Sequence, residues 1–184
     1  FNINSHSAFY VLNPKGDLEN TEITMRKVFK ELSWNGYIRN PPNQEEMVNM
    51  LQNSDLFVYC GHGSGKEFFN YDDLVENKQF CKSTMLLMGC SSGKLNDDGE
   101  ADPNGVPYSC IAAGSGSVVA NLWNVTDGEI DRFLISLLSK MKDGANKNFI
   151  LENAVLESRK SCKLKYLTGA SPVVYGFPTL IQSY

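Results

Sequence analysis

The sequence has 184 residues, of which 42% are hydrophobic and 21% are charged, as is ordinary for one globular domain with a sizeable core. Its net charge of -4 at pH 7 argues against a nucleic-acid-binding surface, and no apolar run approaches the roughly 20 residues of a membrane span. Because the sequence starts with Phe1 rather than Met, we expect it to be a piece of a longer protein.

Strand patterns alternate with helical patterns along the chain. In order, they predict a strand at 7–14, a helix at 20–32, a strand at 36–39, a helix at 43–52, strands at 56–60 and 83–90, a helix at 108–113, a strand at 117–123, helices at 127–141 and 149–159, and an edge strand at 171–180 that Pro178 breaks. In the first helix, Ile23, Val28, Phe29 and Leu32 follow the helical spacing and Met25 does not. The alternation predicts an α/β fold with a largely parallel sheet covered by helices on both faces.

The cysteines favour a reducing environment. Their number is odd and no two form a CxxC pair, which argues against a disulfide framework and against an ordinary zinc ribbon. We therefore expect reduced thiols, and hence a protein of the cytoplasm or nucleus. The five cysteines are Cys60, Cys81, Cys90, Cys110 and Cys162.

Two reactive side chains follow the ends of neighbouring predicted strands. His62, one of only two histidines, lies between Gly61 and Gly63 after the strand LFVYC, and Cys90 follows Gly89 after the strand TMLLM. In parallel sheets functional residues gather beyond the carboxyl ends of the strands. We therefore expect the imidazole and the thiol to meet above the same edge of the sheet.

This pairing suits covalent catalysis at a carbonyl group. A thiolate attacks the carbon, and a nearby histidine activates the thiol and later protonates the leaving amine. The backbone amides of Gly63 and Cys90 are candidates for an oxyanion hole, in which each donor contributes about 3 kcal/mol.

Other interpretations of these residues remain open at this point. In one interpretation, His62 is an ordinary hydrogen-bonding residue at a strand end and Cys90 is a core residue. In another, Cys60, His62 and Cys90 are the ligands of a metal ion. The segments GHGSGK and GCSSGK also suggest phosphate loops, but each is one residue too short for that motif and lacks its final Ser or Thr.

Five segments resemble the catalytic domain of separase, a caspase-like cysteine protease. They are YVLNPKGDLENTE, YCGHGSGKEF, LLMGCSSGKL, NLWNVTDGEIDRF and YLTGASPVVYGFP, in the order of the family and spread over nearly the whole chain. The resemblance implies that residues 1–184 form a separase-like protease domain whose N-terminal helical region is absent. The implied fold is a caspase-like three-layer sandwich with a mostly parallel central sheet.

The resemblance also implies an activity and partners. His62 and Cys90 would be the catalytic dyad of an endopeptidase that cuts after Arg, in a segment with an acid further upstream, in the kleisin subunit of cohesin, and so triggers sister-chromatid separation. Securin would be the inhibitor, bound in the cleft as a pseudosubstrate. No cofactor, metal, nucleic acid or membrane would be involved. The alternative is a catalytically inactive caspase-like module that binds securin or another partner.

A pocket for arginine needs a carboxylate, and the acids nearest a predicted functional strand end follow Trp123. The candidates are Asp127, Glu129 and Asp131; they are also good helix-capping and first-turn residues. The family motif favours Asp131, with Asp127 second. Trp123 is either an apolar wall for the arginine stem or a core residue.

Overall fold

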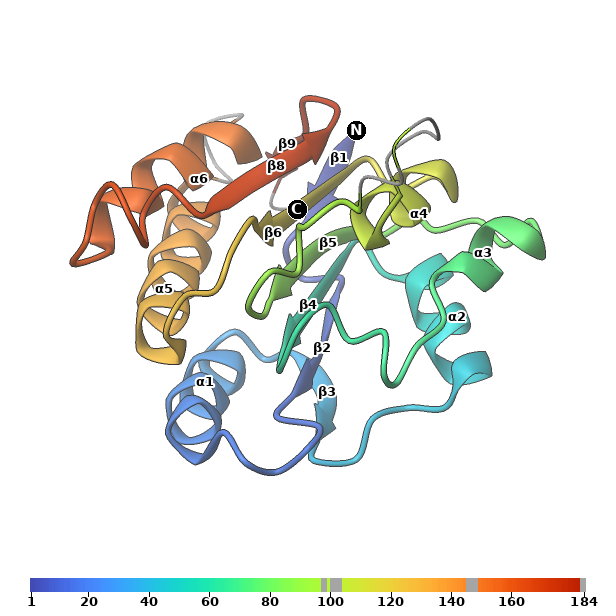
Figure 1. The fold of residues 1–184 in the computed structure, drawn as a ribbon, viewed down its shortest axis with the longest axis horizontal. Helices are drawn as coiled ribbons and strands as arrows, with labels where there is room; N and C mark the ends of the chain where they lie inside the picture. The colour runs from blue at the N-terminus through green and yellow to red at the C-terminus, as the bar shows by residue number, and fades with distance from the viewer. Residues whose placement is uncertain (97–98, 100–103, 145–148, 183–184) are drawn as a thin grey trace.

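A six-stranded sheet forms the centre of the molecule in a computed structural model, which describes residues 1–96, 99, 104–144 and 149–182 (Figure 1). The first five strands of the sheet are parallel and the last, at one edge, is antiparallel to its neighbour. Their spatial order is β3 (Asn35–Ile38), β2 (Ala8–Leu12), β4 (Leu56–Cys60), β5 (Thr84–Met88), β6 (Ser117–Asn121) and β8 (Pro172–Gly176).

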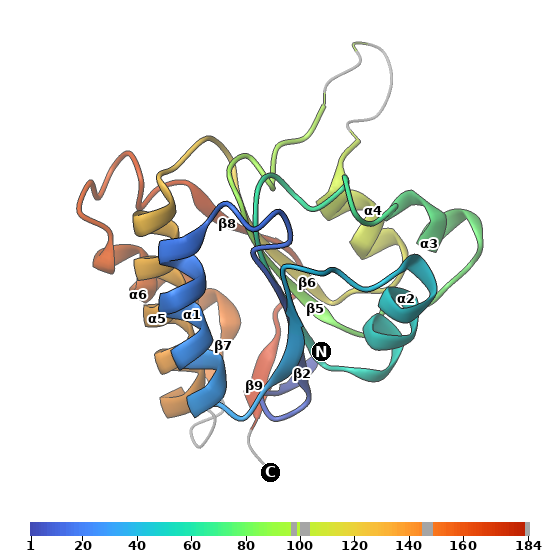
Figure 2. The ribbon, with the colours of Figure 1, turned by 90° about the horizontal axis from the view of Figure 1, so that it is seen from below.

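Helices cover both faces of this sheet, which gives the predicted three-layer sandwich (Figure 2). One layer holds α1 (Glu19–Glu31), α5 (Asp127–Gly144) and α6 (Leu151–Ser158), the last followed by a 3-10 turn (Arg159–Ser161). The opposite layer holds α2 (Gln44–Asn53), α3 (Asp72–Glu76) and α4 (Val106–Ala112). A second, three-stranded sheet holds β1 (Asn2–Asn4), β9 (Leu180–Gln182) and β7 (Phe149–Ile150).

The continuous apolar run of β4 is buried on both sides, as its composition predicts. Leu56, Val58 and Cys60 join the core shared with α1, α5 and α6. Phe57 and Tyr59 point the opposite way and join the core shared with α2, α3 and α4. The alternation anchors the strand in one register, because a slip of one residue would exchange its two faces.

Helix α1 packs on the core with Phe29, Val28 and Leu32 of the predicted face, but not with Ile23. Met25, which did not fit the predicted spacing, is fully buried, whereas Ile23 is 59% exposed. Met25 and Phe29 lie on one side of the helix, and at 100° per residue Ile23 lies nearly opposite them. The buried face also carries two polar residues, Thr21 and Glu22, which the pattern of apolar residues could not identify.

The predicted strands and helices of the central sandwich are confirmed, and the elements of the small sheet were missed. The edge strand ends before Pro178 as expected, and the chain then enters β9 of the second sheet. The short strands β1, β7 and β9 and the one-turn helix α3 have too few residues to show a period. Within the described residues, no helix combines the length and the apolar character needed to cross a bilayer.

Candidate active site

The register of β4 and β5 brings the two candidate catalytic loops to the same place. Cys60 is paired with Met88 across the two parallel strands. His62 and Cys90 each follow two residues after that pair, so their loops leave the same edge of the sheet side by side. This part of the sequence-based prediction depended on strand adjacency, and the pairing confirms it.

Gly89 is in direct backbone contact with the histidine loop. A Cβ atom added at Gly89 would collide with the carbonyl oxygens of Gly63 and Gly61. Only glycine allows this approach, because backbone atoms cannot move aside as a flexible side chain can. The loops that carry His62 and Cys90 therefore touch through their main chains.

The imidazole of His62 is half-exposed and faces a carboxylate. Its Nε2 atom lies 3.0 Å from Oδ2 of Asp17, in the loop between β2 and α1. Donation from Nε2–H to Asp17 leaves the lone pair on Nδ1, which is the tautomer that a general base requires. The backbone carbonyl of His62 accepts a hydrogen bond from the hydroxyl of Tyr59 at 2.9 Å, which holds the loop against the core.

The loop that carries Asp17 is held by the buried Asn13, whose φ is +48°. Its backbone N–H donates to the carbonyl of Cys60 at 2.7 Å, and its side chain accepts from Leu18 N–H at 3.0 Å and donates to Glu22 at 2.7 Å. Hydrogen bonds from Arg39, Asn13 and Arg26 hold the pKa of Glu22 at about 2, although its burial opposes this. Asp17 is thus presented by a loop tied to the end of β4.

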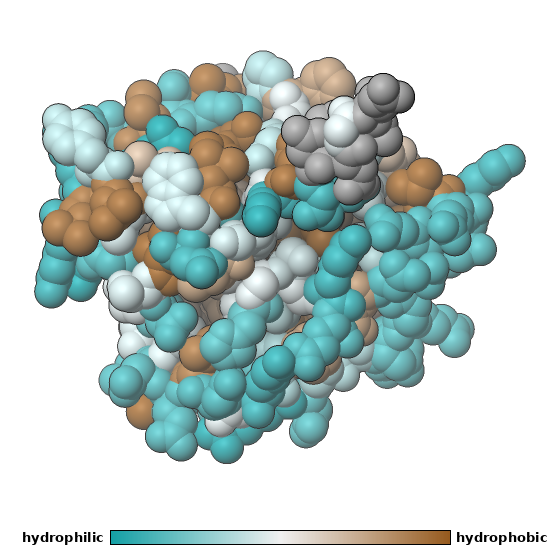
Figure 3. Space-filling model, viewed as in Figure 1, coloured by the Kyte–Doolittle hydropathy of each residue, from teal (hydrophilic) through white to brown (hydrophobic). Residues whose placement is uncertain are grey.

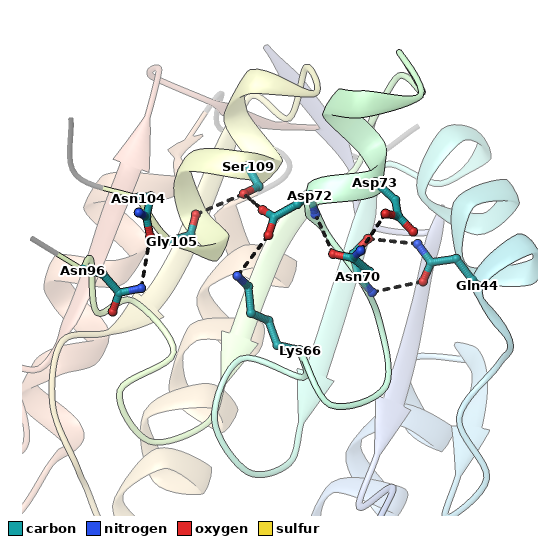
Figure 4. A network of polar contacts seen from close by, with 9 residues as sticks. All are labelled: Gln44, Lys66, Asn70, Asp72, Asp73, Asn96, Asn104, Gly105 and Ser109. Carbon is teal, nitrogen blue, oxygen red and sulfur yellow. Dashed lines mark hydrogen bonds and ion pairs between the residues drawn. The ribbon is translucent and has the colours of Figure 1, made fainter. Parts of the chain in front are cut away.

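The far end of the histidine loop is anchored on the opposite layer by a polar network (Figure 4). Lys66 donates to Asp72 at 3.2 Å, and the hydroxyl of Ser109 in α4 donates to the same carboxylate at 2.5 Å. The hydrogen bond from Ser109, followed by the contact with Lys66, lowers the pKa of Asp72. The hydroxyl of Tyr71 donates to the carbonyl of Ser64 at 3.1 Å. The loop is therefore held at both ends.

The nucleophile loop is fixed to the segment that follows β6. The thiol of Cys90 is half-buried and donates to the carbonyl of Val125 at 2.8 Å. Ser91, whose φ is +53°, donates from its backbone to the carbonyl of Trp123 and from its hydroxyl to Asn124. A serine with positive φ next to the thiol is a strained conformation of the kind found at functional sites.

The two candidate catalytic groups are neighbours that do not bond each other in this conformation. Among the described residues, Cys90 Sγ pairs with Val125 and the His62 ring with Asp17. In the same described part of the chain, the backbone N–H groups of Gly63 and Cys90 donate to no protein acceptor. Gly63 has a φ of +59° and open space on its Cβ side. Two amide donors are thus available near the thiol.

The acids of α5 have three different environments. Asp131 is half-buried between α5 and α1, and the hydroxyl of Thr21 donates to its Oδ2 at 2.9 Å. Burial raises the pKa of Asp131 to about 6, which the Thr21 hydrogen bond opposes and the charge of Asp127 reinforces. Asp127 is exposed in the first turn. Glu129 is buried and already holds Arg132, Lys163 N–H and the hydroxyl of Thr168.

Asp131 is close enough to the end of β4 to act on it electrostatically. Burial, and secondarily the charge of Asp131, raises the pKa of the Cys60 thiol. Cys60 is buried in the core. No three His, Cys, Asp or Glu side chains within the described ranges are grouped as metal ligands.

Trp123 lies next to the nucleophile loop rather than in the core. Its side chain is 37% exposed, and its indole N–H donates to the carbonyl of Leu167 at 3.0 Å. Its own carbonyl accepts from Ser91 N–H at 3.2 Å. Trp123 therefore connects the segment after α6 to the loop of Cys90.

The sequence-based reasoning missed Asp17 and Thr21. Asp17 follows a parallel strand, β2, at the same edge of the sheet as His62, so the rule that identified His62 applies to it as well. It was overlooked because an acid in a turn containing Pro14 and Gly16 has an ordinary turn-forming role. Thr21 gave no signal, since a hydroxyl in a first helical turn is common.

Chemically, the arrangement combines a thiol, an imidazole oriented by a carboxylate, and two free amide donors beside a half-buried acid. It provides a nucleophile, a general base and acid, and donors for a developing oxyanion.

Comparisons with known proteins find related protease domains. The family described as "Separin, protease domain" matches residues 1–130. The separin of Schizosaccharomyces pombe is 39% identical over 184 residues, which cover 97% of this chain and 10% of that protein. The chain therefore spans about a tenth of the length of this relative.

Solved structures agree on the fold. A chain of the Saccharomyces cerevisiae separase–securin complex matches with a TM-score of 0.87 and 35% identity, over 98% of this chain and 12% of that chain. The Arg-specific cysteine proteinase gingipain R matches with a TM-score of 0.63 and 12% identity, over 98% of this chain and 49% of that chain. The fold is therefore caspase-like, as the resemblance implied.

The contact at Gly89 leads to a stability prediction. We expect Gly89→Ala to lower the free energy of unfolding by about 1–3 kcal/mol or more, because the new methyl group must separate two backbone segments. Chemical denaturation measures the change. Gly128→Ala is the matched control, since Gly128 has open space and lies in the first turn of α5, where alanine is the better helix former. Equal stability of both variants would contradict the contact.

Proposed function

Since the chain belongs to the separin protease-domain family, we propose that it acts as a cysteine endopeptidase that cuts after arginine, with His62 and Cys90 as its catalytic pair. The main support is the backbone contact of Gly89 with Gly61 and Gly63, which holds the imidazole loop against the thiol loop.

In the proposed reaction, Cys90 gives its proton to His62 and its sulfur attacks the carbonyl carbon of the substrate. The tetrahedral intermediate places its negative oxygen between the amides of Gly63 and Cys90. Its collapse breaks the peptide bond, and the leaving amine takes the proton from His62. Water, activated by His62, then hydrolyses the thioester to a carboxylate and restores the thiol.

The resting thiol must first leave the carbonyl of Val125, to which it donates at 2.8 Å. We propose that a rotation about the Cα–Cβ bond of Cys90 releases the thiol, while the hydrogen bonds of Ser91 hold the backbone of the loop. Catalytic hydrogen bonds are often formed only when substrate binds. Asp17 stabilises the imidazolium that forms once the proton has moved.

Asp131 is the proposed partner of the substrate arginine. It lies beyond the same sheet edge as the thiol, and the hydroxyl of Thr21 occupies one side of its Oδ2 atom. Burial has removed water from this carboxylate and raised its pKa. Hydrogen bonds from a substrate guanidinium would replace those lost to water and stabilise the ionised form. Asp127 is the second candidate for this role. Trp123 would line the path of the substrate.

We further propose that the substrate is the kleisin subunit of cohesin and that securin inhibits by occupying the cleft, in the cytoplasm and nucleus. The support for securin is the likeness to the separase chain of a separase–securin complex. All five cysteines are free thiols, which fits a reducing compartment.

The function is tested with fluorogenic peptides that end in arginine. We expect cleavage by the intact protein, and loss of more than about 1,000-fold in kcat/KM in both Cys90→Ala and His62→Ala, because each removes a reacting group. Peptides ending in lysine or alanine serve as specificity controls. Cleavage that survives Cys90→Ala, or binding of securin without any cleavage of arginine peptides, would favour the inactive binding module.

Asp131 leads to a prediction about pH. We expect kcat/KM for arginine peptides to fall as the pH drops through about 6, because the carboxylate must be ionised to pair with guanidinium. Asp131→Asn should lower kcat/KM roughly 10- to 100-fold at pH 7.5 and abolish this fall of kcat/KM at acidic pH. Asp127→Asn should instead shift the fall of kcat/KM to lower pH, since the Asp127 charge helps to raise the pKa of Asp131.

The same raised pKa predicts that replacing the Asp131 carboxylate with an uncharged group stabilises the protein at alkaline pH. Folded Asp131 binds its proton more tightly than the unfolded chain does, so its ionised form costs stability at pH 8 and the cost disappears as the pH falls below the unfolded value. Asp131→Asn should therefore raise Tm at pH 8, as measured by calorimetry. A lower Tm in that variant would show that the ionised carboxylate is stabilising instead.

Asp17 leads to a prediction about kcat. We expect Asp17→Asn to lower kcat about tenfold with little change in KM, because it orients the imidazole and does not contact substrate. Asp17→Glu should restore part of the loss. Glu67→Gln is the matched control, since it breaks the Lys15–Glu67 ion pair between the same two loops. Equal losses in both variants would mean that the charge pairs only hold the loops together.

A further inference from the structure

A cavity of about 470 Å³ lies beside the nucleophile loop, on the side away from His62. It is open to solvent and bordered by the segment after β6, the first turns of α5 and the segment that follows α6. Its lining includes Val125, Thr126, Glu129, Leu164, Leu167 and Thr168. Of the three acids considered above as partners of arginine, only Glu129 lines it, and neither His62 nor Cys90 does.

Three charged residues, Glu129, Arg132 and Lys163, line this cavity, and the carboxylate of Glu129 is already satisfied. Glu129 is buried, is paired with Arg132, and accepts from Lys163 N–H at 2.7 Å and from the Thr168 hydroxyl at 2.9 Å. A carboxylate with these partners does not require a further cation. Its role is to hold the segment after α6 against α5, which keeps the cavity in shape.

The walls of the cavity offer unburied apolar surface. Leu164 and Leu167 are 56% and 58% exposed, whereas Val125 beside them is buried. Figure 3 shows hydrophobic side chains gathered over the segment between α6 and β8, at the left of the view. The indole N–H of Trp123 donates to the backbone carbonyl of Leu167. This hydrogen bond holds the segment that carries the apolar surface in place.

The cavity and the candidate active site share two residues. Val125 lines it and also provides the carbonyl that accepts from the Cys90 thiol. Asn124 lines it as well and accepts from the hydroxyl of Ser91. A peptide bound at the thiol would therefore lie next to residues that also line the cavity.

The order of the strands says which half of a substrate passes the cavity. His62 follows β4, Cys90 follows β5, and Asn124 follows β6, which are consecutive neighbours in the sheet. The histidine must face the leaving amine, which begins the C-terminal half of the substrate. The acyl half, with the residues N-terminal to the cleaved bond, then extends over the end of β6.

We propose that this cavity is a substrate subsite that takes an aliphatic side chain from a residue N-terminal to the cleaved bond, with Leu164, Leu167 and Val125 as its apolar walls. The proposal rests on the proposed function, because the direction of the substrate follows from the roles of His62 and Cys90. An extended peptide alternates its side chains, so one position among the few before the arginine faces the cavity.

The test is a positional scan of arginine-ending fluorogenic peptides with the intact protein. Each of the four positions before the arginine carries leucine, alanine, serine or glutamate in turn. We expect one position at which leucine gives about tenfold higher kcat/KM than alanine, because its side chain leaves water. In the double variant Leu164→Ser, Leu167→Ser, that leucine-to-alanine ratio should fall to near 1.

Leu156→Ser is the matched control, since Leu156 is 55% exposed on α6 and does not line the cavity. It should keep the wild-type ratio. The proposal is overturned if no position prefers leucine, or if the double variant keeps the preference. It is equally overturned if the double variant lowers cleavage of leucine and alanine peptides by the same factor.

Binding measurements separate this proposal from the proposed function. Fluorescence anisotropy of labelled, uncut peptides with Cys90→Ala reports the subsite without turnover. Tighter binding of the leucine peptide by about tenfold, lost in the double variant, supports the subsite even if no peptide is ever cleaved. Equal binding of the leucine and alanine peptides overturns it even if arginine peptides are cut.

Discussion

The close approach of two backbone segments at Gly89 is the constraint on which the site depends. Parallel pairing of β4 with β5 brings the loops to one edge, but pairing alone leaves their separation undetermined. The absence of a side chain at Gly89 lets its main chain rest on the carbonyls of Gly61 and Gly63. The imidazole and the thiol are then set by main-chain contact, which is less adjustable than contact between side chains. Asn13 adds the Asp17 loop to the same assembly through the carbonyl of Cys60.

The site also contains a feature that opposes folding. Asp131 is half-buried, near the thiol of Cys60 and the carboxylate of Asp127. This environment disfavours the ionised form of Asp131. A chain selected only for stability would place an uncharged residue there. Thr21 offsets part of the cost with a hydrogen bond, and a bound guanidinium would offset more. Glu22 and Glu129 show the contrast, since each has two or more donors and is a structural carboxylate.

The sequence predicted what depends on pattern and missed what depends on tertiary contact. The strands and main helices follow from runs and periods of apolar residues, and the order of the strands in the sequence is enough to predict that His62 and Cys90 lie at one edge of the sheet. Ile23 was predicted to face the core and Met25 was not, and the structure shows the reverse. A helix with polar residues on its buried face has no clear apolar stripe from which to predict its orientation. Asp17, Thr21 and the carbonyl of Val125 were missed, because their roles come from partners far along the chain or from the backbone itself.

The segment after β6 connects substrate binding to the nucleophile. Consecutive residues in it hold the Cys90 loop, since Trp123 and Val125 provide carbonyls and Asn124 provides a side-chain oxygen. Its other side bounds the cavity, and Trp123 also carries the hydrogen bond to Leu167. The acceptor of the resting thiol and one wall of the cavity therefore belong to the same short stretch of backbone.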